Sequence, residues 1–396
     1  MPTKFKQIPP PDDRRSVSTW SLLLAGGVVL ALVMGQWTLL VAILGLAFLI
    51  TVHEFGHFIA AKSFGMQVEK FYVGFPPAAW KKKRGETEYG VGIIPLGGFC
   101  KISGMTPEEE VPEGTGDRVY HKAPVWKRNL TIFAGPFMNF VAAVVILFVF
   151  LLVQGTTTAT LTLDEVVAKT PAAEAGLKAG DTIVGADGRR WTEWKQASEY
   201  FRDNPGKTIE LTYVAAGAGR AGSSGATGAG ATAEKTVRVT LKEHPDAPGQ
   251  GYLGVRAGTK TEHPGPLRAA WLSLIGLKDV TWGVFYGIYL LASGAISVSG
   301  PEGAVGPVGI IDVSGNAVRQ GWYPILLAFL SANLGIMNLL PILPFDGGHI
   351  LFNTVERIRG RRMNPKVLER IVAFGVTLLV LLFVLLTYND IKRIFG

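Results

Sequence analysis

The sequence contains a single cysteine, Cys100, among 396 residues. One thiol excludes an intramolecular disulfide and a cysteine-rich zinc cluster, so each folded part must be held together by its own apolar core. Charged residues are also scarce, at 18%, compared with about 25% in average globular proteins. This deficit argues against both a disordered polymer and an ordinary cytosolic enzyme. A membrane protein is therefore the expected class.

The apolar residues are concentrated in long runs. The run from Trp20 to Ala61 is about twice as long as a single membrane crossing, which predicts two helices that meet near Gly35. The expected spans are residues 20–35, 37–62, 130–153, 322–346 and 367–388. Residues 267–296 carry Arg268, Lys278 and Asp279 among aromatic residues, a pattern typical of an interfacial amphipathic helix. The basic tail of residues 1–19 could also begin a signal peptide, but no small-residue cleavage pattern follows it, which favours an anchor helix.

Positive charge predicts the orientation of the chain. Lysine and arginine cluster in the loop of residues 63–129 and again in residues 357–366. The positive-inside rule places both segments in the cytoplasm, together with the basic tail. Five spans then put residues 154–320 and the C-terminus on the outer face. Because the net charge of +8 is explained by this topology, we expect no nucleic-acid partner.

Three ionisable residues interrupt the second apolar run. His53 and His57 are four positions apart, so a helix places them on one face, where two neutral imidazoles can hold one Zn²⁺. Glu54 lies close enough to take a proton from a water at the metal, which is the H-E-x-x-H pattern of metalloproteases. An ionisable residue inside a membrane span costs about 2.5–3.5 kcal/mol on insertion. Three of them within five positions are therefore poorly explained as a polar helix end.

A catalytic zinc that keeps one position open needs a third protein ligand. Two of the remaining histidines, His244 and His263, fall in the predicted outer region. Asp346 and His349 lie at the cytoplasmic end of the 322–346 span, on the same side as the H-E-x-x-H motif. Spacing alone leaves the choice between Asp346 and His349 open.

The combination of motifs resembles the site-two protease family, the intramembrane zinc metalloproteases. Residues 53–57 match the first motif of that family, and residues 338–347, which read Asn-Leu-Leu-Pro-Ile-Leu-Pro-Phe-Asp-Gly, are similar to the second. Phe345 stands where the family usually has leucine. Residues 135–139, Gly-Pro-Phe-Met-Asn, are similar to its G-P-x-x-N element. The resemblance covers nearly the whole chain.

The resemblance implies an intramembrane zinc endopeptidase in a bacterial plasma membrane, with its active site near the cytoplasmic side. It implies that His53, His57 and Asp346 bind Zn²⁺ and that Glu54 is the catalytic residue. The implied substrates are single-pass membrane proteins already trimmed by an upstream site-one-type protease, such as an anti-sigma factor, or remnant signal peptides. Compared with the best-known enterobacterial-type members, the chain has an extra N-terminal span and one candidate PDZ domain where those have two.

A predicted strand in the cytoplasmic loop is a candidate substrate-binding element. Residues 88–101 alternate in polarity and are interrupted by Pro95, Gly97 and Gly98, and they resemble the membrane-entering β-hairpin of the family. A transmembrane helix satisfies its own backbone, so a protease must hold its substrate extended, which pairing with an edge strand would achieve. The alternative is an ordinary cytoplasmic hairpin.

Two asparagines in the 322–346 span need partners, because a buried amide without a hydrogen bond costs free energy. Asn333 and Asn338 either bridge helices or bind the substrate backbone and the oxyanion formed on attack, and the sequence leaves both options open. Together with Asn139, Gly97 and Gly98 they are the candidate substrate-binding residues.

The outer region is predicted to contain one PDZ domain at residues 159–245. Residues 171–188 resemble the PDZ signature of bacterial envelope proteases, with a short helix that ends at Gly176 and a hairpin turn at Asp187-Gly188. Residues 215–233 are almost wholly Ala, Gly, Ser and Thr, a composition that predicts a flexible insert.

The predicted fold class is a polytopic α-helical membrane protein with a membrane-associated β-hairpin and one α+β PDZ domain. Two other functions compete with the protease. A non-catalytic membrane PDZ scaffold predicts that Glu54→Gln leaves function intact. A membrane metalloprotease that cuts soluble peptides would need a glutamate ligand on a later helix, for which Glu356 and Glu369 are the candidates.

Overall fold

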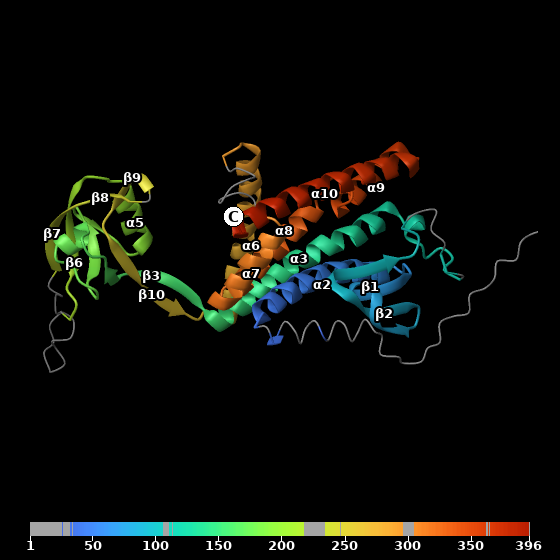
Figure 1. The fold of residues 1–396 in the computed structure, drawn as a ribbon, viewed down its shortest axis with the longest axis horizontal. Helices are drawn as coiled ribbons and strands as arrows, with labels where there is room; N and C mark the ends of the chain where they lie inside the picture. The colour runs from blue at the N-terminus through green and yellow to red at the C-terminus, as the bar shows by residue number, and fades with distance from the viewer. Residues whose placement is uncertain are drawn as a thin grey trace, which may run out of the picture. The chain divides into compact units, whose positions relative to one another are not determined.

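The structure is a computed structural model of the chain. It describes residues 35–105, 111–112, 114–217, 234–245, 247–295, 305–361, 363 and 365–395, together with Gly26, Leu32 and Val33. Most of the predicted span at residues 20–35 and most of the insert at residues 215–233 lie outside the described residues. The chain divides into two compact units, Met1–Phe150 with Leu267–Gly396, and Leu151–Pro266 (Figure 1).

The first unit is built mainly from helices. Four of its described helices are long and apolar enough to cross a membrane. They are α2 (Trp37–Ser63), α3 (Val125–Gln154), α6 (Pro266–Ala292) and α10 (Pro365–Phe395). The helix α2 begins at the predicted residue, whereas α3 begins five residues before the predicted residue 130. A shorter helix, α7 (Pro307–Gln320), packs against both α2 and α10.

The predicted boundary of the 322–346 span is wrong. Residues 322–346 do not form one helix, because α8 (Tyr323–Asn338) ends early and Asp346 opens a separate helix, α9 (Asp346–Arg359). Pro341 and Pro344 lie between the two helices, and proline cannot continue a helical hydrogen-bond ladder. Residues 267–296, predicted as an interfacial helix, contain α6, whose length and composition also suit a crossing. Its three charged residues are too few among its apolar residues to exclude one.

The loop between α2 and α3 forms a bent antiparallel ribbon of β1 (Val68–Arg84) and β2 (Thr87–Ile102). Residues 68–73 pair on one side with residues 98–102 and on the other with residues 88–91, so residues 98–102 become an outer edge of the ribbon. This edge runs beside α2. The hairpin expected from the sequence is therefore present, in a longer and more strongly bent form.

The turn between β1 and β2 is held in place by ion pairs. The Glu86 carboxylate accepts hydrogen bonds of 2.7 and 2.8 Å from Arg118 and pairs with Lys62 at 2.5 Å. These two cations hold the pKa of Glu86 near 2. The ion pair with Lys62 thereby links the β1–β2 hairpin to the C-terminal end of α2, the helix that carries the H-E-x-x-H motif.

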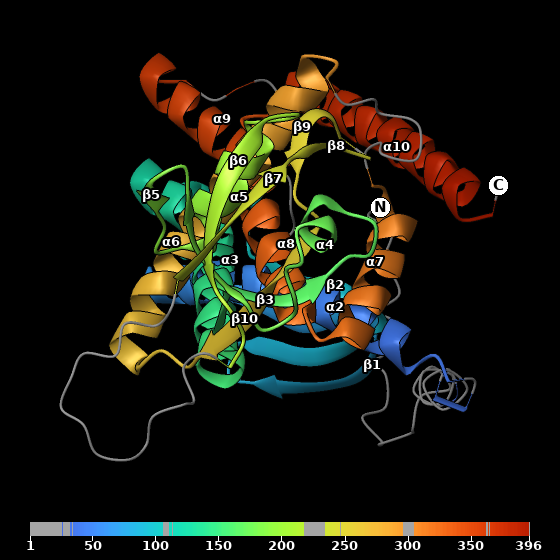
Figure 2. The ribbon, with the colours of Figure 1, turned by 90° about the vertical axis from the view of Figure 1, so that its left-hand side faces the viewer.

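The second unit is an antiparallel sheet with two short helices (Figure 2). Its strand order is β10-β3-β4-β6-β7, with β5 paired to β4 and a separate β8–β9 ribbon. Its elements are β3 (Thr156–Val166), α4 (Pro171–Glu174), β4 (Thr182–Ala186), β5 (Arg189–Arg190), α5 (Trp194–Arg202), β6 (Thr208–Val214), β7 (Glu234–Thr240), β8 (Lys242–His244), β9 (Ala247–Tyr252) and β10 (Val255–Glu262). Leu163, Ile183 and Leu211 are at most 1% exposed and form part of its core.

The local features predicted for this unit are present. Gly176 has a φ of +80° just after α4, and Asp187 and Gly188 have φ of +48° and +76° in the turn between β4 and β5. Two consecutive positive φ values are those of a type I′ hairpin turn. The unit extends beyond the predicted residues 159–245, because β10 pairs with β3 along most of its length.

Candidate metal centre

His53 and His57 lie one turn apart on α2, and both are more than 90% buried. Glycine allows α3 to approach them closely. A Cβ atom at Gly135 would lie 2.4 Å from Cε1 and Nε2 of His57 and 2.9 Å from Nε2 of His53. A Cβ atom at Gly56 would lie 2.2 Å from the carbonyl oxygen of Ala134. The two helices therefore touch at the imidazoles only because neither glycine carries a side chain.

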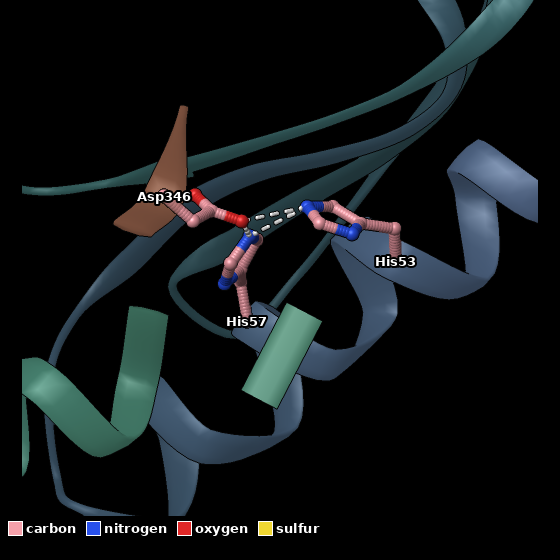
Figure 3. Close-up of side chains that lie close together, drawn as sticks. All are labelled: His53, His57 and Asp346. Carbon is pink, nitrogen blue, oxygen red and sulfur yellow. Dashed lines mark hydrogen bonds and ion pairs between the residues drawn. The ribbon is translucent and has the colours of Figure 1, made fainter. Parts of the chain in front are cut away.

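Asp346 completes a cluster with the two histidines (Figure 3). Its Oδ2 lies 3.0 Å from Nε2 of His53 and 3.4 Å from Nε2 of His57, and the two Nε2 atoms are 3.2 Å apart. Two imidazole nitrogens and a carboxylate oxygen are a donor set that suits Zn²⁺ with one position left for water or substrate. His349, which spacing left as the alternative, is not part of this cluster.

Glycines also explain how Asp346 reaches the imidazoles. The chain turns back on itself between α8 and α9, so the start of α9 packs against the residues just before it. A Cβ atom at Gly347 would lie 2.2 Å from the carbonyl oxygen of Leu339, and one at Gly348 would lie 2.6 Å from the backbone nitrogen of Leu343. This turn places the Asp346 carboxylate at the first position of α9.

The Nδ1 atom of each imidazole contacts a group on α3. Nδ1 of His57 lies 2.9 Å from the carbonyl oxygen of Thr131, so Nδ1 carries the proton and Nε2 keeps its lone pair. Nδ1 of His53 lies 3.1 Å from the side-chain amide of Asn139, which is fully buried. The amide turns its Nδ2 group toward Nδ1, and the Asn139 Oδ1 atom has no partner among the described residues. With the amide rotated by 180°, Oδ1 would accept the Nδ1 proton, and both Nε2 atoms would be free to bind a metal.

Glu54 is held by the ribbon. Its Oε2 accepts a 3.1 Å hydrogen bond from the backbone N–H of Cys100, in the outer edge of β2. A Cβ atom at Gly98 would lie 2.9 Å from Cγ of Glu54, so a larger residue there would push against the carboxylate. The cluster of imidazoles and carboxylates therefore lies beside an edge strand.

Comparison with known proteins identifies the family. The sequence model described as Peptidase family M50 matches residues 41–382. The chain belongs to peptidase family M50.

Curated M50-type relatives are named as zinc metalloproteases. Zinc metalloprotease Rip1 of Mycobacterium tuberculosis is 31% identical over 374 residues, covering 81% of this chain and 86% of that protein. Regulator of sigma-W protease RasP of Bacillus subtilis is 27% identical over 431 residues, covering 88% and 96%. Putative zinc metalloprotease FN1322 of Fusobacterium nucleatum is 30% identical over 362 residues, covering 91% and 100%. This chain is thus a membrane zinc metalloprotease of the M50 family, as the resemblance implied.

The structure of this M50 peptidase adds to the role expected for Asn139. Its side chain is fully buried and contacts His53, which makes it a group that positions this imidazole, and its contact with substrate stays a prediction. Asn333 and Asn338 are half-buried on α8, and neither side chain hydrogen-bonds to another residue that the structure describes. Gly97 is buried against Ile50 of α2.

Three contacts in the site were not foreseen from the sequence. The carbonyl of Thr131 and the N–H of Cys100 are backbone groups, which any residue would supply, so no sequence signal marks them. The hydroxyl of Ser331 on α8 donates a 2.8 Å hydrogen bond to the carbonyl oxygen of Asn139 and thereby ties α8 to α3. A serine within an apolar run is too common to be singled out.

Replacing Asn139 with alanine should weaken zinc binding. Without the amide, His53 loses the group that orients its ring, and loss of such a contact typically lowers metal affinity about 10–100-fold. Zinc affinity of the purified chain can be measured by competition with a chelator. Asn333→Ala is the matched control, because that amide does not contact a histidine and should leave the affinity unchanged. Equal affinities for wild type and Asn139→Ala would show that Asn139 has no such role.

Proposed function

We propose that this M50 peptidase cleaves single-pass transmembrane proteins within the bilayer. The observation that carries the proposal is the position of its site. His53, Glu54 and His57 lie on α2, a helix long and apolar enough to cross a membrane, and the edge of β2 contacts this helix at Glu54. A site in such a place is reached most directly by a substrate that is itself in the membrane.

The proposed chemistry is a zinc-assisted hydrolysis. His53, His57 and Asp346 would hold Zn²⁺, which as a Lewis acid polarises a carbonyl and makes a water more acidic. Glu54 acts as general base toward the attacking water and then passes the proton to the leaving amine. The Cys100 N–H fixes Oε2 of Glu54 during this transfer. Asn139 and the Thr131 carbonyl keep the two imidazoles in place.

The outer edge of β2 is proposed to hold the substrate. An unwound segment that added to residues 98–102 as a further strand would run past Glu54, and main-chain pairing requires no particular substrate sequence. Gly97 and Gly98 keep this edge free of side chains where it meets α2. Asn333 and Asn338 are proposed to bind the substrate backbone or the oxyanion, because their amides hydrogen-bond to no other described residue.

We further propose that the Leu151–Pro266 unit is a PDZ domain on the outer face of a bacterial plasma membrane. Its support is the order of short helix, strand and hairpin turn at residues 171–188 and the positive-inside pattern of the remaining loops. Such a domain would admit or exclude substrates according to their outer portion. An anti-sigma factor trimmed by an upstream protease is a candidate substrate, in line with the name of the Bacillus subtilis relative.

The experiment is a cleavage assay with the zinc-loaded chain and a tagged single-pass protein reconstituted in the same liposomes. The products, mapped by mass spectrometry, should end inside the transmembrane segment of the substrate. A matched substrate whose transmembrane segment is polyleucine should be cut more slowly, since it unwinds less readily. If the chain cuts only peptides added in solution, or only outside the segment, the proposal is wrong.

A further inference from the structure

A cavity lies between the start of α3 and the end of α9, and none of its lining residues belongs to the metal centre. Its volume is about 290 Å³. The residues that line it are His121, Val125, Arg128, Glu356, Arg357, Gly360 and Arg361. Three arginines and a histidine face one carboxylate, so the cavity carries net positive charge. Nothing in the proposed protease mechanism uses these residues.

Arg128 is a lining residue whose side chain is held in place by neighbouring groups. Its side chain is only 13% exposed, and its Nη1 donates a 3.0 Å hydrogen bond to Oδ1 of Asn353 and lies 3.6 Å from the Glu356 carboxylate. Asn353 in turn donates a 2.9 Å hydrogen bond to the hydroxyl of Tyr120. The Arg128 Nε atom is buried without an acceptor among the described residues. The guanidinium is thus held rigidly along one edge, a geometry suited to an oxyanion.

The other two arginines are free to move toward a ligand. Arg357 lies in the last turn of α9, and Arg361 follows Gly360, whose φ of +66° ends that helix. Both side chains are exposed, and neither pairs with a carboxylate in the part of the chain that the structure describes. Glu356 alone therefore opposes the three positive charges of the lining.

The surroundings of the cavity point to lipid. It lies at the first turn of α3, one of the candidate membrane spans, and therefore at the depth of the headgroups if α3 crosses. Large apolar side chains that adjoin lining residues in the chain are exposed, with Trp126 next to Val125 at 56% and Ile358 next to Arg357 at 79%. Tryptophan is typical of the membrane interface, and basic pockets at the ends of spanning helices are typical sites for anionic headgroups.

We propose that this cavity binds the phosphate group of an anionic glycerophospholipid, with Arg128, Arg357 and Arg361 as its cationic partners. The phosphate would join the start of α3 to the end of α9. Asp346 is the first residue of α9, about 16 Å along the helix from Arg357 at 1.5 Å per residue. A bound lipid would hold the far end of the helix that carries Asp346, at a site distinct from the metal centre.

The test is a lipid titration of the full zinc-loaded chain in detergent, with bound lipid counted by native mass spectrometry. Phosphatidylglycerol should bind and phosphatidylcholine should not. The double variant Arg357→Gln with Arg361→Gln should bind phosphatidylglycerol about 30-fold more weakly, since each surface arginine contributes about 1 kcal/mol to anionic-lipid binding. Arg128 is left intact, because its loss would also break the hydrogen bond to Asn353.

The matched control removes two charges elsewhere. Arg359 and Lys392 are exposed and do not line the cavity, so Arg359→Gln with Lys392→Gln should retain wild-type binding. A parallel titration adds inorganic phosphate, the other source of this ligand chemistry, to the lipid-bound chain. Displacement of phosphatidylglycerol by inorganic phosphate from the wild type, but not from the variant Arg357→Gln with Arg361→Gln, supports the phosphate site. Equal phosphatidylglycerol binding by the two double variants, or equal binding of phosphatidylcholine, would overturn the proposal. Zinc content equal to wild type shows that each variant is folded.

Discussion

Replacing Glu54 with glutamine is expected to stop proteolysis and leave zinc bound. Glu54 is not one of the three candidate zinc ligands, so its replacement does not remove a zinc ligand. A glutamine oxygen can still accept the hydrogen bond from the Cys100 N–H, but it cannot take a proton from water. General-base catalysis contributes about 10²–10⁴-fold, so the cleavage rate in liposomes should fall by that factor.

A second carboxylate of the ribbon provides the control for this experiment. Glu69 pairs with Lys101 and does not belong to the cluster of candidate metal ligands, so Glu69→Gln should cleave at nearly the wild-type rate. Zinc content should be the same in all three proteins. Wild-type cleavage by Glu54→Gln would show that Glu54 is not the general base of this peptidase.

Replacing Gly135 with alanine is expected to abolish both zinc binding and activity. The added methyl group would lie 2.4 Å from two ring atoms of His57, far inside van der Waals contact. Moving the two helices apart to make room would break the close packing of Gly56 against the backbone of Ala134 at the same level. The imidazole must rotate away from Asp346, and zinc affinity should fall by at least about 100-fold.

The control for this prediction is Gly283→Ala in α6. A Cβ atom there meets no heavy atom within 4 Å, and alanine is the better helix former by about 1 kcal/mol. Gly283→Ala should therefore bind zinc like wild type in the chelator competition. If Gly135→Ala also kept its zinc, the close approach of α3 to the imidazoles would not exist in solution.

Much of the site could be predicted from the sequence because its signals are local. The spacing of His53 and His57 puts them on one helix face whatever surrounds them. The ribbon, the turn at Gly176 and the hairpin at Asp187-Gly188 follow from glycine positions and alternating polarity, which also act over short distances. For these features local chemistry and the final structure agree.

The features that sequence reasoning missed depend on contacts between distant segments. Pro341 and Pro344 mark a break near the end of the 322–346 run. The packing of Gly347 and Gly348 against the preceding turn, which starts α9 as a separate helix, is not visible in the sequence. The contact of Asn139 with His53 was not predicted, because polarity alone does not reveal the partner of a buried amide.

The choice of the third ligand shows the same limit. Asp346 and His349 are three residues apart, and both occur near the end of the same apolar run, so periodicity favours neither. The family resemblance implied Asp346. In the structure the carboxylate of Asp346 reaches both Nε2 atoms, whereas His349 remains outside the cluster.

The most direct test of the metal centre compares zinc content and cleavage rate in Asp346→Asn and His349→Ala, measured on the same reconstituted samples. Asp346→Asn should lose most of its zinc and cleave no substrate, because an amide is a weaker ligand than a carboxylate. His349→Ala should keep its zinc. Full zinc and activity in Asp346→Asn, together with their loss in His349→Ala, would contradict the ligand set proposed for this peptidase.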